Sequence, residues 1–170
     1  GIRAIAWTDV IQGAVLFVGF LVLFFLMINQ FGPLSAATDV IAQTPNAVKL
    51  ERPDASMLRQ WLSYILLVGM GGALYPQAIQ RIYAAKSVNT LKRSLGAMAF
   101  MPFISVFIAV IAGIYAMAYV PGLEGAATDQ ALASVLRIIQ EQSLFGYALV
   151  VLIFSAVLAA LMSTADSAML

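Results

Sequence analysis

The chain has 170 residues, of which 62% are hydrophobic and only 10% are charged, and its formal net charge is +1. A soluble domain carries about 25% charged residues, so this composition excludes an ordinary soluble protein and predicts an all-α membrane protein. Cysteine and histidine do not occur, which removes disulfides and the usual zinc and haem ligands, and we expect no cofactor. The net charge is too small to indicate a nucleic-acid-binding surface, so the expected partners are the lipid bilayer and small solutes.

The first long apolar segment covers residues 4–29. A bilayer core requires about 20 apolar residues, so we expect a membrane-spanning helix here. Asp9 and Gln12 interrupt the apolar run too early for a cleavable signal peptide. Because the chain starts at Gly1 and stops at Leu170 inside an apolar segment, we expect an internal fragment of a larger protein, whose other helices would be partners of this one.

The second predicted spanning helix covers residues 58–84 and contains a glycine cluster followed by a proline. Glycine costs a helix about 1 kcal/mol relative to alanine and proline about 3 kcal/mol, so we predict a break near Gly69-Gly72. Irregular backbone at membrane depth is tolerated where it lines a cavity, and secondary transporters build solute sites from such helices. We therefore expect Gly69, Gly71, Gly72 and Tyr75 to line a solute site; close helix packing of small residues is the alternative.

The third predicted spanning helix covers residues 90–119, and the charges around it predict the orientation of the chain. The short connection 85–89 and its flanks carry four basic residues and no acid, whereas the loops 30–57 and 120–143 carry six of the eight acids. By the positive-inside rule the short connection is cytoplasmic and the two longer loops lie outside. We expect an integral protein of the bacterial inner (plasma) membrane, with Tyr115 among its interfacial aromatic residues.

The second outer loop contains an amphipathic stretch. Thr128 is a predicted N-cap for a short helix over residues 129–142, whose apolar residues fall on one face. A shorter helix is predicted near 35–43 in the first outer loop. The fourth spanning helix follows over residues 144–170.

This fourth helix ends in a polar stripe. At about 100° per residue, Ser163, Thr164, Asp166 and Ser167 fall within roughly 160° of arc. Hydroxyls and a carboxylate are hard oxygen ligands for a small cation, and an ionisable residue inside a membrane segment marks a functional site. The predicted orientation places Asp9 at a similar depth, so it completes the oxygen cluster if the first and fourth helices touch.

Three stretches of the chain resemble motifs of the sodium/solute symporter family, in the order and spacing of that family. They are Trp-Thr-Asp-Val-Ile-Gln at 7–12, Gln-Arg at 80–81 followed by Ala-Ala-Lys-Ser at 84–87, and Ala-Ala-Leu-Met-Ser-Thr-Ala-Asp-Ser at 159–167. The resemblance implies a leucine-transporter-type bundle of two inverted five-helix repeats, with the four predicted helices as core helices five to eight. It further implies sodium-coupled symport of a small organic solute, and no enzyme.

The resemblance also assigns ligands to a first sodium site. The Ala160 carbonyl and the hydroxyls of Ser163 and Thr164 match the part of this site that the eighth core helix supplies. The remaining ligands of this site would come from a core helix outside this fragment.

A second cation site lies between the fifth and eighth core helices in some members of the family. Its pattern matches Asp9, Ser163, Asp166 and Ser167. Members of the family often have a hydroxyl at the position of Asp166, so this carboxylate either strengthens the second site or carries a proton.

Few residues of the sequence bear on the identity of the solute. Sugar-transporting relatives have bulky aromatic residues where this chain has Gly71 and Gly72, and the Tyr75-Pro-Gln step is similar to the small-carboxylate and pantothenate branches. We therefore expect a monocarboxylate, pantothenate or an amino acid. Two other functions stay open: a symporter-like membrane sensor domain of a signalling protein, and an intramembrane aspartyl protease that uses Asp9 and Asp166.

Overall fold

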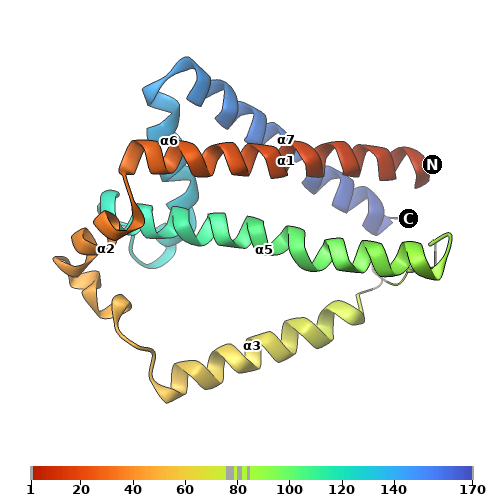
Figure 1. Cartoon of the computed structure of the whole chain (residues 1–170), viewed down its shortest axis with the longest axis horizontal. Helices are drawn as coiled ribbons and strands as arrows, with labels where there is room; N and C mark the ends of the chain where they lie inside the picture. Colours follow the sequence, from red (N-terminus) through yellow and green to blue (C-terminus); the bar gives the residue numbers. More distant parts are fainter. Residues whose placement is uncertain (1, 76–78, 80–81, 84, 170) are drawn as a thin grey trace. The chain divides into compact units, whose positions relative to one another are not determined.

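The computed structural model describes residues 2–75, 79, 82–83 and 85–169. Of these, the side chains at positions 2–6, 72–73, 164 and 166–169 lie outside the description. The chain divides into two compact units, one formed by residues 1–50 and 101–170 and the other by residues 51–100. The described residues form helices and no strand (Figure 1), which confirms the all-α class.

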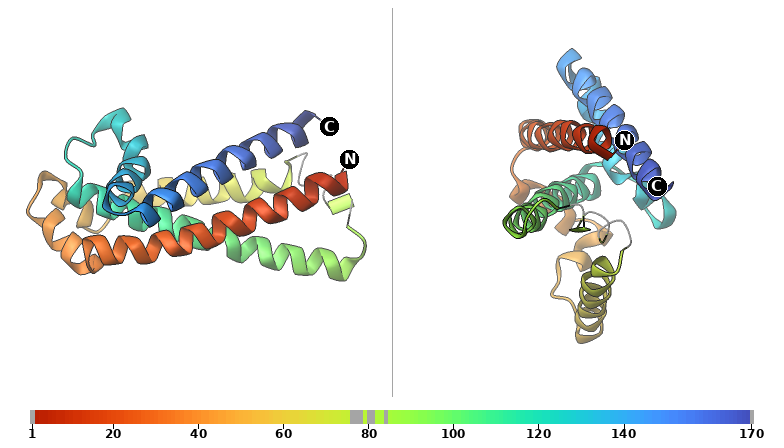
Figure 2. Two further views of the ribbon diagram at one scale, coloured as in Figure 1. Left: turned by 90° about the horizontal axis from the view of Figure 1, so that it is seen from above. Right: turned by 90° about the vertical axis from the view of Figure 1, so that its right-hand side faces the viewer.

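Helices α1 (Ile2–Phe31) and α7 (Leu144–Met169) form a pair in the first unit. Figures 1 and 2 show them side by side, with the beginning of α1 next to the end of α7, so the two helices are antiparallel. Helix α1 ends because Gly32 adopts a φ of +80° and donates its backbone N–H to the Ile28 carbonyl, a frequent way to end a helix.

The hydrophobic core of the first unit lies where α1 ends and α7 begins. It also includes α2 (Leu34–Ala42), α6 (Ala131–Gln142) and the last turns of α5 (Val88–Tyr119). The fully buried members of this core include Leu23, Met27, Ala37, Ala112, Tyr115 and Val135. The apolar stripe of α6 predicted from the sequence faces this core through Val135, Leu136 and Ile139.

Three aromatic residues, Phe31, Tyr115 and Tyr119, tie the end of α1 to α5, and we call this region the aromatic end. Tyr115 is fully buried and donates its hydroxyl to the Gly32 carbonyl at 2.6 Å, while Tyr119 donates to the Phe31 carbonyl at 3.3 Å. Phe31 stacks on both rings. Tyr115 is therefore a buried core residue whose hydroxyl pairs with the Gly32 carbonyl, and its predicted interfacial depth stays a prediction.

The start of α6 also differs from the prediction. Residues Gly125–Gln130 form a 3-10 helix, and the α-helix begins at Ala131 rather than at residue 129. The Thr128 hydroxyl donates to the Gly125 carbonyl at 2.7 Å, so Thr128 is not the N-cap. Gly125 has a φ of +55°, and the tight turn that it starts takes up the residues expected to cap α6.

The second unit contains α3 (Ala55–Ala73), capped by the Asp54 carboxylate, which accepts from the Met57 backbone N–H at 2.7 Å. The helix is interrupted close to the predicted position near Gly69-Gly72: α3 continues through the glycine cluster, ends at Ala73 and is followed by non-helical backbone at Leu74 and Tyr75. Each glycine weakens a helix only modestly, whereas the residue before a proline is sterically driven out of the helical region.

Three helices in the described part of the chain are long and apolar enough to cross a membrane. They cover Trp7–Phe31, Val88–Tyr119 and Leu144–Ser163. The sequence predicts four such helices; α3, the described part of the second, is not among the three, and residues 76–78, 80–81 and 84 of the predicted segment 58–84 lie outside the described residues.

Candidate cation site

The first and last helices meet through a carboxylate and a hydroxyl. The Ser163 hydroxyl on α7 donates a hydrogen bond to the Asp9 carboxylate on α1, and both side chains are half-buried. The two residues are 154 positions apart in the sequence, so this contact depends on the packing of α1 against α7.

A second contact fixes the register between the two helices. A Cβ on Gly19 would lie 3.0 Å from the Ile153 Cγ1 atom. Gly19 follows Asp9 by ten residues, and Ile153 precedes Ser163 by ten, so the antiparallel pair keeps one register over about 15 Å. Gln12, three residues after Asp9, is therefore level with Ala160, three residues before Ser163.

Gln12 is a residue of this site that the sequence analysis did not assign. Its side-chain oxygen Oε1 is buried and has no hydrogen-bond donor in the described structure. A buried amide oxygen without a partner costs about 1–3 kcal/mol, and an amide oxygen is a hard ligand for cations. The i, i+3 spacing from Asp9, which places both residues on one face of α1, was the signal available in the sequence.

We call the region of Asp9, Gln12 and Ser163 the polar end. It offers three kinds of oxygen: a carboxylate, an amide and a hydroxyl. Asp9 belongs to an apolar helix of membrane-spanning length, where ionisable groups pair with other groups or mark ion pathways.

The other predicted cation ligands are only partly described. Ala160 is half-buried on α7, one turn before Ser163. The side chains of Thr164, Asp166 and Ser167 lie outside the described residues. The described residues contain no group of three or more His, Cys, Asp or Glu side chains placed to hold a metal ion.

The predicted solute-lining residues belong to the second unit. Gly69, Gly71 and Gly72 lie in the last turns of α3, and Tyr75 follows that helix with 55% of its surface exposed. No described atom comes within 4 Å of a Cβ built on Gly69 or Gly71, so the small-residue packing considered as the alternative has no partner in the described chain. Their role in solute binding stays a prediction.

Long apolar helices that meet through a carboxylate and a hydroxyl are typical of a class of helical membrane proteins, the ion-coupled secondary transporters. A model described as the sodium:solute symporter family matches residues 1–170, and the chain belongs to that family. The resemblance in the three sequence motifs is thereby confirmed. Comparison with curated proteins and with solved structures finds no match.

Membership of this family has direct consequences. The protein is an integral membrane protein of a family of sodium-coupled symporters, whose members are typically transporters. The family implies sodium as the coupling ion and small solutes as substrates.

Proposed function

We propose that α1 and α7 hold the coupling cation of a symporter that takes up a small organic solute. The hydrogen bond between Ser163 and Asp9 supports this proposal more than any other single observation, because it joins the two helices within the segments expected to span the membrane. The buried, unpartnered oxygen of Gln12 adds a further ligand at the same end of α1.

Binding of a cation here would favour one arrangement of the two helices. A small cation attracts the oxygens of both α1 and α7, so its binding energy stabilises the arrangement in which they are close. Any solute site that prefers the same arrangement is then strengthened by sodium, and sodium binding is strengthened by the solute to the same degree. This reciprocity is the physical basis of coupling.

Two overlapping ligand sets are proposed. The first uses the carbonyl of Ala160 with the hydroxyls of Ser163 and Thr164. The second uses Asp9, Ser163, Asp166 and Ser167, with the amide oxygen of Gln12 beside it. Asp166 either completes the second set as a carboxylate or accepts a coupled proton.

The proposed solute is a small carboxylate: a monocarboxylate, pantothenate or an amino acid. Small residues at Gly71 and Gly72 leave room that sugar transporters fill with aromatic residues, and Tyr75 fits the carboxylate branches of the family. The proposed arrangement is a leucine-transporter-type bundle in which these helices are core helices five to eight, in a bacterial plasma membrane.

Uptake into proteoliposomes that contain the full-length protein tests this function. We expect accumulation of radiolabelled pyruvate, pantothenate or proline only with an inward sodium gradient. Ser163→Ala should raise the sodium concentration for half-maximal uptake by about tenfold, since a hydroxyl ligand bound to an ion contributes about 1.4 kcal/mol or more. Ser155→Ala, on an exposed part of the same helix, is the matched control and should leave uptake unchanged.

Three outcomes would contradict the proposal. Uptake that proceeds without any sodium gradient would remove sodium as the coupling ion, and dependence on a proton gradient that Asp166→Ser abolishes would assign the coupling to a proton. Equal sodium dependence in the wild type and in Ser163→Ala would remove Ser163 from the ligand set.

A further inference from the structure

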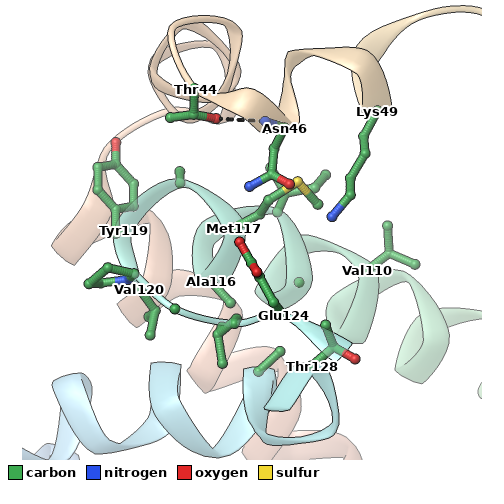
Figure 3. Close-up of a pocket in the computed structure, with 17 residues that line it drawn as sticks. Thr44, Asn46, Lys49, Val110, Ala116, Met117, Tyr119, Val120, Glu124 and Thr128 are labelled. Carbon is green, nitrogen blue, oxygen red and sulfur yellow. Dashed lines mark hydrogen bonds between the residues drawn. The ribbon is translucent and has the colours of Figure 1, made fainter. Parts of the chain in front are cut away.

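A cavity of about 610 Å³ lies in the first unit, beside the aromatic end. It is lined by the last turns of α5, the loop that follows, and the 3-10 helix Pro45–Leu50 (Figure 3). Tyr119 lines it and also bonds to Phe31, the last residue of α1. Asp9 lies 22 residues earlier on that helix, about 33 Å away at 1.5 Å per residue, so this cavity is separate from the polar end.

Two oppositely charged side chains enter the cavity from different walls. Figure 3 shows the Lys49 ammonium and the Glu124 carboxylate pointing toward the same space. Within the described residues, neither of them has an ion-pair or hydrogen-bond partner for its charged group. The side-chain amide of Asn46 also lines the cavity.

Local hydrogen bonds brace the backbone on both walls, while the Lys49 and Glu124 side chains themselves are exposed. The Thr44 hydroxyl donates to the Ile41 carbonyl at 2.8 Å and accepts from the Asn46 backbone N–H at 3.2 Å. On the other wall, Gly122 has a φ of +79° and its carbonyl accepts from the Glu124 backbone N–H at 3.1 Å. These local hydrogen bonds order the segments that carry Lys49 and Glu124.

The remaining lining is apolar and includes Val110, Ile114 and Met117. Space is available because α5 presents Gly113 here, where no described atom lies within 4 Å of a built Cβ. The volume is within the range of about 300–1,000 Å³ that small-molecule sites occupy, and such sites combine apolar walls with a few polar groups that orient the ligand.

We infer that this cavity binds an amino acid with an apolar side chain in its zwitterionic form. The Lys49 ammonium binds the carboxylate of the ligand, the Glu124 carboxylate binds its ammonium group, and the side chain rests on Ile114 and Met117. A ligand that carries only one charge satisfies only one of the two walls. This site is separate from the cation site and does not depend on sodium coupling.

The methyl group of Met117 provides a local probe of binding. The full-length protein in lipid nanodiscs, labelled with ¹³C-methyl methionine, is titrated with L-leucine, L-leucinamide and N-acetyl-L-leucine, and Met117→Leu assigns the resonance. We expect leucine to shift the Met117 signal saturably. The other two compounds each lack one charge, so they should bind at least about tenfold more weakly, since charge-assisted hydrogen bonds are the strong ones. An unmoved Met117 signal, or equal shifts from all three compounds, would overturn the proposal without any variant.

Variants locate the binding groups. Lys49→Gln and Glu124→Gln should each weaken leucine binding by about tenfold, whereas Glu141→Gln, exposed and outside the cavity, should not change it. Gly113→Leu extends a side chain into the open space and should abolish the shift. Retained leucine binding in Lys49→Gln, Glu124→Gln and Gly113→Leu would contradict the assignment.

Ser163→Ala separates this site from the proposed coupling function. It should leave the Met117 shift intact even where it impairs sodium-driven uptake. Loss of the Met117 shift in Ser163→Ala would show that the signal reports the transport site instead, and would also overturn the proposal.

Discussion

The two ends of α1 are both held by hydroxyl donors, but the acceptors differ in kind. At the aromatic end, Tyr115 and Tyr119 donate to backbone carbonyls. At the polar end, Ser163 donates to the carboxylate of Asp9. A carbonyl is neutral, whereas a carboxylate at membrane depth is charged and marks a functional site. The aromatic end is therefore a structural joint, and the polar end offers a charged oxygen ligand.

Burial follows the same division. Tyr115 has 0% of its surface exposed, and the core of the first unit surrounds it. Near the polar end, Trp7 is 70% exposed and Met162 is 69% exposed. The buried core of the first unit therefore lies toward the aromatic end of the helix pair, away from the polar end.

The largest effect is expected at the aromatic end. Tyr115→Ala removes a buried ring, its stacking on Phe31 and its hydrogen bond to Gly32. Truncation of a buried aromatic residue costs about 3–5 kcal/mol, so the thermal unfolding midpoint of the full-length protein in detergent should fall markedly.

Tyr115→Phe is the matched control for this prediction. It keeps the ring and removes only the hydroxyl, so it should cost about 0.5–1.5 kcal/mol. Equal midpoints for Tyr115→Ala and the wild type would show that the aromatic end is not the anchor of α1.

A pair of glycine substitutions tests the difference in packing. A Cβ on Gly146, in the first turns of α7, would overlap the Ile139 carbonyl oxygen of α6. Gly146→Ala should therefore cost about 1–3 kcal/mol through overpacking. Gly13, near the polar end, has no described atom within 4 Å of a built Cβ, so Gly13→Ala should be neutral or stabilise by up to about 1 kcal/mol. Thermal unfolding measures the stability of both variants. Stability changes of the same sign and size would show that the two ends of the helix pair do not differ in packing.

The next effect concerns function rather than stability. Asp9→Asn keeps an oxygen that accepts the Ser163 hydrogen bond but removes the charge. The concentration of sodium for half-maximal uptake should rise about tenfold, which corresponds to about 1.4 kcal/mol, while the unfolding midpoint stays the same. Asp39→Asn, at an exposed position of α2, is the control. A large loss of stability in Asp9→Asn with unchanged sodium dependence would make Asp9 a structural residue.

The features that depend on apolar length could be predicted from the sequence. The first, third and fourth spanning helices were predicted over 4–29, 90–119 and 144–170, within two residues of the observed bounds at each end. Such helices need about 20 apolar residues, and this requirement is visible in the composition. The proximity of Asp9 and Ser163 was also accessible, because polar residues that interrupt two apolar segments at equal depth have few other partners.

Two kinds of feature could not be predicted from the sequence: those that depend on the balance between the conformational preferences of neighbouring residues, and those that depend on contacts with residues far away in the sequence. The break in the second predicted helix was placed near Gly69-Gly72, but its exact residue depends on the balance between the glycines and the following proline, and α3 ends at Ala73, beyond the glycines. The burial of Tyr115 depends on the Gly32 carbonyl, 83 residues away in the sequence. The buried oxygen of Gln12 becomes visible only when α7 covers that face of α1.

The smallest effect is expected away from both ends of α1. Arg137 and Glu141 form an ion pair on α6 at 3.1 Å, with 79% and 61% of their side-chain surfaces exposed. Exposed pairs at i, i+4 contribute about 0.3–0.5 kcal/mol at most and are screened by salt, and the order of basic before acidic residue is the less favourable one. Arg137→Ala should therefore leave sodium-driven uptake unchanged and shift the unfolding midpoint only slightly, and the shift should vanish at high salt. A salt-independent loss of stability as large as that of Gly146→Ala would mean that α6 is held in place through its exposed face. It would then not be held through Val135 and Ile139, which pack into the core.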